Sequence, residues 1–157
     1  TLRVILASIN GIAYAKNIPL VGVDGLEALL EEQQSPNYPI TIALLNAYNH
    51  DAYYGISINN KITQTGYKNI TELLLSIKSN FSNSMIRFIG QGVHLFKNNI
   101  LHHFADAAYI PTSIPEAASL DFIAQKAHTG WRQGKSTHQL LPLYLKTLNY
   151  KKSITQN

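Results

Sequence analysis

The sequence predicts an α/β fold, and three observations carry that prediction. Residues 2–16 place apolar side chains at helical spacing, and residues 18–23 are a short apolar run of the kind that forms a buried strand. Asp24 follows as a typical N-cap residue and opens a second helical pattern. After Pro39 the sequence pattern changes to apolar and aromatic runs separated by turn residues, which favours strands. Helices and strands mixed in this order are typical of an α/β domain.

The first predicted helix, residues 2–16, has two different sides. Its apolar stripe consists of Leu2, Ile5, Leu6, Ile9, Ile12 and Ala13. The opposite side is small or amphipathic, with Arg3, Ala7, Asn10 and Tyr14. Gly11 destabilises the helix by about 1 kcal/mol relative to alanine. A glycine at this position is best explained if the backbone of another segment comes close to it.

The remaining elements follow in order. We expect a strand over residues 18–23, then a helix from Asp24 through Leu29 that ends by Pro36. Residues 40–48, 52–58 and 61–65 predict a three-stranded antiparallel meander, with a tight turn at Asn59-Asn60. A helix over 70–79, a strand over 85–89 and a helix over 116–131 complete the chain, the last with Pro115 at its first turn.

Composition limits the class of protein. At 157 residues, with 45% hydrophobic and 14% charged residues, the chain can form one domain or two small lobes around a proper core. No apolar run approaches the roughly 20 residues of a membrane span, and no secretory leader is visible. The absence of cysteine excludes disulfides, thiolate zinc sites and cysteine nucleophiles, and it fits a cytoplasmic protein. Thr1 in place of methionine indicates a processed or trimmed product.

Positive charge is concentrated in the second half of the chain. Residues 1–85 carry a net charge of −1, whereas residues 86–157 carry +5. Between positions 126 and 152 there is no acidic residue and there are six cations: Lys126, Arg132, Lys135, Lys146, Lys151 and Lys152. This stretch could contact phosphate, including tRNA directly, although a solvated basic face is the plainer interpretation.

No set of residues predicts an active site. His50, His94, His128 and His138 have no histidine or carboxylate at the three- or four-residue spacing of helical metal motifs. Gly90-Gln91-Gly92 lacks the third glycine of a dinucleotide loop and the lysine of a P-loop, which favours a plain turn. We therefore predict no catalytic residue, no metal ligand and no cofactor.

The N-terminal residues closely resemble a segment of the bacterial TsaB family, also called YeaZ. The resemblance is specific over the helix, strand and helix of residues 2–30, which include Ile18-Pro19-Leu20-Val21-Gly22-Val23. It is looser over residues 46–54, over Gly90-Gln91-Gly92 and over Pro142-Leu143-Tyr144-Leu145-Lys146. Positions 46, 48 and 146 carry Asn, Tyr and Lys where the family has Asp, Arg and Arg.

The resemblance implies an actin-like/Hsp70-like ATPase fold made of two ribonuclease H-like lobes. Residues 1–37 would be the remainder of the N-terminal lobe, and residues 38–157 a C-terminal α/β lobe with the meander and the C-terminal helix. Family members carry about 65–70 residues before this point, so the resemblance implies an N-terminally truncated subunit with an incomplete first lobe. The apolar stripe of the first helix, at Leu2, Ile5, Ile9 and Ile12, would then lack the sheet against which it packs.

The resemblance also implies a function, that of a non-catalytic scaffold subunit. TsaB acts with the catalytic paralogue TsaD in the threonylcarbamoyl modification of adenosine 37 in tRNA. TsaD follows the shared strand with two metal-binding histidines, and the matching positions here are Gly25 and Leu29, which cannot bind a metal ion.

The expected partners follow from the same family. They are a TsaD-like subunit, a TsaE-like ATPase in the same complex, a second copy in a homodimer, and tRNA only through the complex. We expect the first helix to dock on the partner through Arg3, Ala7, Asn10, Gly11 and Tyr14. The alternative is a metal- or ATP-dependent glycoprotease-like enzyme of the same fold.

Overall fold

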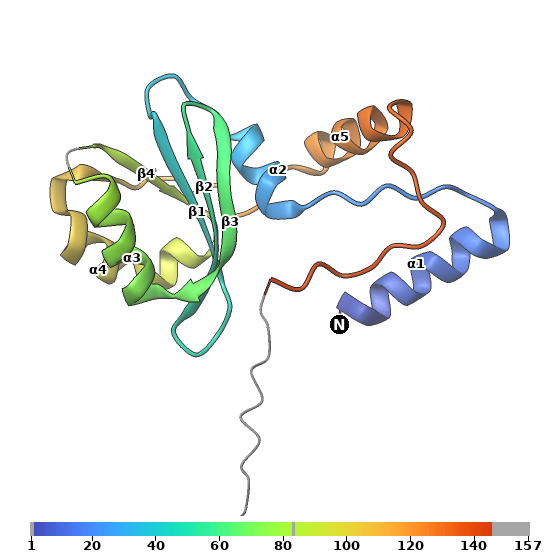
Figure 1. Cartoon of the computed structure of the whole chain (residues 1–157), viewed down its shortest axis with the longest axis horizontal. Helices are drawn as coiled ribbons and strands as arrows, with labels where there is room; N and C mark the ends of the chain where they lie inside the picture. The colour runs from blue at the N-terminus through green and yellow to red at the C-terminus, as the bar shows by residue number, and fades with distance from the viewer. Residues whose placement is uncertain (1, 83, 146–157) are drawn as a thin grey trace, which may run out of the picture.

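A five-stranded mixed sheet forms the centre of the computed structural model, which describes residues 2–82 and 84–145 (Figure 1). The strands are β1 (Ile40–Asn46), β2 (Asp51–Ile58), β3 (Lys61–Asn69), β4 (Ile86–Ile89) and β5 (Ala108–Tyr109). Their spatial order is β3-β2-β1-β4-β5; β1, β2 and β3 are antiparallel, whereas β4 is parallel to both β1 and β5. The predicted meander is confirmed, and β3 runs four residues further than expected.

Helices cover both faces of this sheet. The helical elements of the described residues are α1 (Leu2–Lys16), α2 (Gly25–Glu32), α3 (Ile70–Asn80), α4 (Gly92–Phe104), the 3-10 turn η1 (Ala105–Ala107) and α5 (Leu120–Arg132). Figure 1 shows α3 and α4 on one face and α2 on the other, with α5 beyond α2. The predicted mixed α/β class is confirmed.

The alternation of side chains along β1 divides the core in two. Ile42 and Leu44 point to the α3–α4 side and are fully buried there with Phe88 of β4. Ala43 points to the other side and packs with Leu29 of α2. The sheet and its helices are therefore held by apolar burial on both faces.

Two sequence predictions are wrong in detail. Residues 18–23 do not form a strand, because the only pairing there is an isolated bridge between Leu20 and Thr137 within the described residues. The last helix begins at Leu120 instead of residue 116. Ser119 caps it by accepting a hydrogen bond from the Phe122 amide at 3.1 Å, while the Pro115 carbonyl accepts one from Gly90 N at 2.8 Å.

Helix α4 was not predicted from the sequence. Its buried residues Val93, Phe96, Ile100 and Phe104 recur at helical spacing, but the polar Asn and His residues between them obscure the pattern. The two-residue strand β5 was also not predicted, since such a short pairing has no signal of its own.

The predicted N-cap at Asp24 is confirmed and leads to a first prediction. Its Oδ1 accepts hydrogen bonds from the amides of Leu26 (2.8 Å) and Glu27 (3.1 Å). We expect Asp24→Ala to lower the free energy of unfolding by about 1 kcal/mol, since two amides at the start of α2 lose their acceptor. Urea unfolding measures this loss, and Asp24→Asn is the control that keeps an acceptor. An equal loss in both variants would contradict the capping role.

Candidate protein-docking surface

Helix α1 is held on the rest of the chain by one polar edge. The Arg3 Nε donates a hydrogen bond to the Tyr144 hydroxyl at 2.6 Å, and its guanidinium lies 5.3 Å from the centre of that ring. Two helical turns further along, the Asn10 side chain donates a hydrogen bond to the Leu140 backbone carbonyl and accepts one from the Leu140 backbone N–H, each at 2.9 Å. Ala13 is the buried residue of the helix. Because residues 3, 10 and 13 share one face, this face is turned to the chain's own 140–144 segment.

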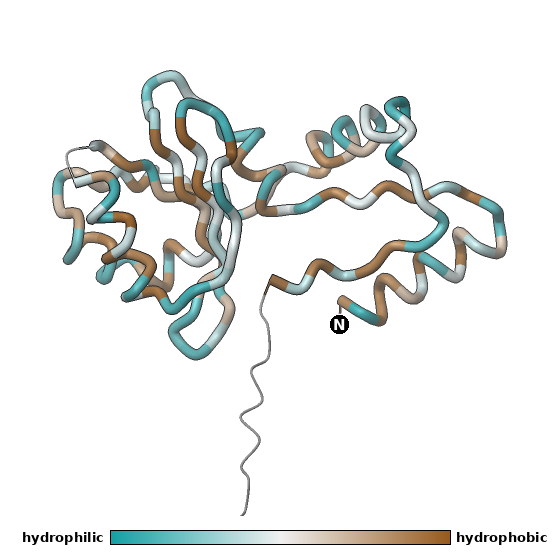
Figure 2. Tube along the Cα trace, viewed as in Figure 1, coloured by the Kyte–Doolittle hydropathy of each residue, from teal (hydrophilic) through white to brown (hydrophobic). Residues whose placement is uncertain are grey.

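Two exposed groups of side chains lie next to this edge of α1, one on each side of it. One is the apolar stripe of Leu2, Ile5, Ile9 and Ile12, which are 55%, 50%, 38% and 63% exposed. The other carries Ala7, Gly11 and Tyr14, and the Tyr14 side chain is 89% exposed. A Cβ added at Gly11 would meet no atom within 4 Å. Figure 2 shows hydrophobic residues recurring along α1 as they do in the sheet.

The five residues predicted for docking share one broad side of α1 but differ in their contacts. Arg3 and Asn10 contact the chain itself and fix the orientation of α1. Ala7, Gly11 and Tyr14 lie next to them at helical spacing and are exposed, and we call these three residues the docking face. The contacts of Leu140 and Tyr144 with α1 were not predicted from the sequence, because they span 130 and 141 residues and leave no local signal.

The positions matched to metal-binding histidines lie in different environments. Gly25 is exposed at the start of α2, and a side chain there would have open space. Leu29 is fully buried against Ala43 and Ile89 of the sheet. A side chain at position 29 thus serves the core and does not reach solvent or a ligand.

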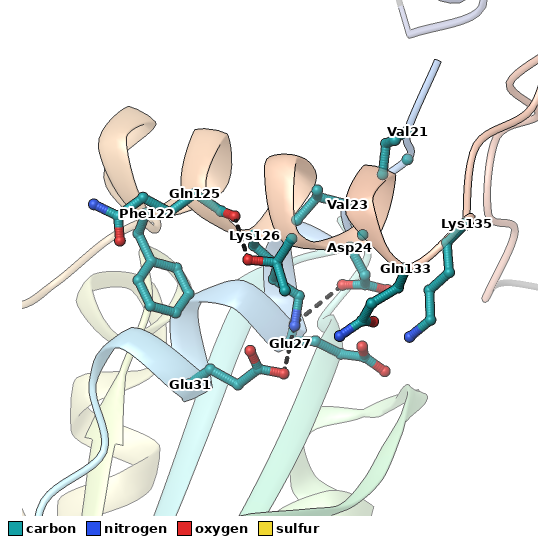
Figure 3. A pocket seen from close by; sticks show the side chains of 13 residues that line it. Val21, Val23, Asp24, Glu27, Glu31, Phe122, Gln125, Lys126, Gln133 and Lys135 are labelled. Carbon is teal, nitrogen blue, oxygen red and sulfur yellow. Dashed lines mark hydrogen bonds and ion pairs between the residues drawn. The ribbon is translucent and has the colours of Figure 1, made fainter. Parts of the chain in front are cut away.

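A polar pocket of about 650 Å³ lies between α2 and α5 (Figure 3). One wall carries Asp24, Glu27 and Glu31, and the other carries Lys126 together with Lys135. Lys126 Nζ is 2.5 Å from Glu31 Oε1, so this cation joins the two helices. The Asp24 carboxylate is already used by the N-cap of α2. The pocket has room for a small polar molecule, but Asp24, Glu31 and Lys126 already bind groups within the chain.

Several of the histidines make side-chain contacts within the chain. His94 pairs with Glu116 at 3.0 Å, and the rings of His102 and His103 lie edge to face at 5.3 Å. Desolvation, followed by the nearby His102 and Lys78, lowers the pKa of His103. Within the part of the chain that the structure describes, no three His, Cys, Asp or Glu side chains gather as a metal site would require.

The basic stretch is only partly visible. Lys126 is paired with Glu31, whereas Arg132 and Lys135 are exposed at the end of α5. Lys146, Lys151 and Lys152 lie outside the described residues. None of the described helices is long and apolar enough to cross a membrane.

Comparison with known proteins gives structural neighbours only. No protein-family model and no curated protein matches the chain. The crystal structure of an uncharacterized protein with similarity to peptidase YeaZ from Pseudomonas aeruginosa superposes with a TM-score of 0.65 at 17% identity, over 92% of this chain and 67% of that one. YeaZ from Pseudomonas aeruginosa superposes with a TM-score of 0.59 at 15% identity, over 90% of this chain and 67% of that one. The resemblance seen in the sequence is confirmed in three dimensions: this chain has the fold of the YeaZ structures.

Proposed function

We propose that this chain is a non-catalytic partner subunit that resembles TsaB and docks on a TsaD-like catalytic subunit. It would support the threonylcarbamoyl modification of adenosine 37 in tRNA. The observation that carries the proposal is the outward docking face of α1, Ala7, Gly11 and Tyr14, in a chain with the YeaZ fold.

The chemistry of the docking face suits contact with another helix. Tyr14 offers a large rigid ring with a polar tip, the kind of residue that dominates binding energy at interfaces. Gly11 has no side chain and Ala7 has only a methyl group, so a partner backbone can approach closely. The bonds of Arg3 and Asn10 to Tyr144 and Leu140 fix α1 in place before the partner arrives.

The same proposal includes the organisation of the whole assembly. The fold would be actin-like/Hsp70-like with ribonuclease H-like lobes, the first of them incomplete and comprising residues 1–37. The chain would work in the cytoplasm beside a TsaE-like ATPase, reach tRNA only through the complex, and form homodimers. Burial of Leu29, at a position where the catalytic paralogue has a metal-binding histidine, supports a role without a metal centre of its own.

The docking face is tested by charge substitution. We expect Tyr14→Arg and Ala7→Glu each to weaken binding to the TsaD-like subunit at least about tenfold, since a desolvated charge would replace an apolar contact. Titration calorimetry with the purified catalytic subunit measures the change. Leu75→Arg is the matched control, because Leu75 is 52% exposed on α3, outside the docking face. Unchanged affinity in both α1 variants would refute the docking role.

The absence of an active site is tested separately. Elemental analysis and nucleotide titration of the isolated chain are expected to find no stoichiometric metal and no tightly held nucleotide. A bound metal ion in a one-to-one ratio would favour the glycoprotease-like alternative instead.

A further inference from the structure

The polar pocket between α2 and α5 contains two charged side chains that the chain itself does not use. Lys126 is paired with Glu31, and the Asp24 carboxylate caps α2. Glu27 and Lys135 line the same pocket, and within the described residues neither side chain makes a hydrogen bond or an ion pair. Figure 3 shows both extending toward the same end of the pocket, with Glu31 at the other end. The pocket thus offers one free carboxylate and one free ammonium group.

Both free charges are carried by well-defined backbone. Glu27 lies in the first turn of α2, and its amide donates a hydrogen bond to the Asp24 cap at 3.1 Å. Lys135 follows the end of α5, where Gly134 has φ of +75° and turns the chain back. The Lys135 amide closes this turn by donating to the Gly130 carbonyl at 2.9 Å. The two side chains therefore start from fixed points on opposite walls of the pocket.

The surroundings of these two charges indicate which ligand fits between them. A carboxylate and an ammonium group are together complementary to a zwitterion, whose own two charges also cancel. The side-chain amide of Gln133, which lines the same pocket, adds a hydrogen-bond donor and an acceptor. Val21 and Val23 add apolar surface, which favours a ligand with an apolar part. The volume of about 650 Å³ is in the range of small-molecule sites.

We propose that the pocket between α2 and α5 binds a free α-amino acid with an aliphatic side chain. The ammonium group of the ligand pairs with Glu27, its carboxylate pairs with Lys135, and its side chain packs on Val21 and Val23. The bound amino acid then joins α2 to the end of α5, a helix with no fully buried residue. The inference goes beyond the proposed docking function and does not depend on it, because no residue of α1 lines this pocket.

Titration with L-leucine and two analogues tests the proposal. The first analogue, 4-methylpentanoate, is leucine without the ammonium group, and the second, isoamylamine, is leucine without the carboxylate. We expect L-leucine to bind with a Kd of about 1 mM or below, measured by NMR from the shifts of the Glu27, Gly130 and Lys135 amides. Each analogue should bind at least about tenfold more weakly, since it leaves one protein charge unpaired.

Two variants identify the role of each charge. Glu27→Gln should weaken L-leucine at least about tenfold and leave the affinity for 4-methylpentanoate unchanged, because that analogue has no ammonium group to lose a partner. Lys135→Met should likewise weaken L-leucine and leave isoamylamine unchanged. Glu72→Gln and Lys97→Met are the matched controls, since both side chains are exposed on α3 and α4, across the sheet from the pocket. Both controls should bind L-leucine as the unmodified chain does.

Three results would overturn the proposal. The first is the absence of any shift at the pocket amides with L-leucine at about 20 mM, well above the expected Kd. The second is an analogue that binds as tightly as L-leucine. The third is an equal loss of L-leucine and 4-methylpentanoate binding in Glu27→Gln, since a general disturbance of the pocket and not a lost ion pair would then be the cause.

Discussion

Gly90→Ala is expected to be the most destabilising single-methyl substitution in the chain. Gly90 has φ of +91°, which is unfavourable for any residue with a Cβ. An added Cβ would also lie 2.4 Å from the Leu44 carbonyl oxygen, and a strand backbone cannot move aside as a flexible side chain can. Strain and overlap together predict a loss of about 3 kcal/mol or more, measured by urea unfolding.

Gly11→Ala provides the matched comparison. This glycine lies within α1, and an added methyl group meets nothing within 4 Å. We expect it to raise stability by up to about 1 kcal/mol through helix propensity. Opposite signs for the two glycines would confirm that Gly90 serves close packing after β4. Equal effects would contradict that assignment and reopen a ligand-binding role for the Gly90-Gln91-Gly92 turn.

Leu29→His is the second substitution with a large expected effect. Leu29 is fully buried, with 0% of its surface exposed, and packs in one apolar cluster with Ala43 and Ile89. The variant loses apolar packing and buries an imidazole without a hydrogen-bond partner, so we expect a loss of about 3 kcal/mol or more in free energy of unfolding. Gly25→His, at an exposed position with open space, should change stability by no more than about 0.5 kcal/mol.

The double variant tests the interpretation of this position directly. If Leu29 faces the core, then Gly25→His combined with Leu29→His should not create a metal site, and added zinc should not raise the melting temperature. A zinc-dependent stabilisation would show that both side chains can turn to a common ligand. That result would contradict the assignment of position 29 to the core.

Local patterns predicted much of the fold. The helical spacing of Leu2, Ile5 and Ile9 was sufficient for α1, and the carboxylate of Asp24 was sufficient for the start of α2. The meander was predictable because apolar runs and the Asn59-Asn60 turn define it within a short stretch. In these cases the determining contacts are close in sequence.

Tertiary contacts account for what could not be predicted. An apolar run such as residues 18–23 becomes a strand only if neighbours pair with it, and only Leu20 finds one among the described residues. Helix α5 begins after Ser119 and not after Pro115. The backbone amide and the hydroxyl group of Ser119 donate hydrogen bonds to the Glu32 carboxylate of α2, a contact that is distant in sequence. The orientation of α1 depends on Tyr144 and Leu140, so the local sequence could not indicate that Arg3 and Asn10 bind the chain itself while Tyr14 stays exposed.

Photo-crosslinking from position 14 is the most direct test of the docking claim. A photoreactive phenylalanine replaces Tyr14 in one variant and Leu75 in another, since both side chains are exposed but lie on different helices. Each variant is irradiated in the presence of the TsaD-like subunit. We expect a crosslink to the catalytic subunit from position 14 and none from position 75. A crosslink from position 75 with none from position 14 would contradict it.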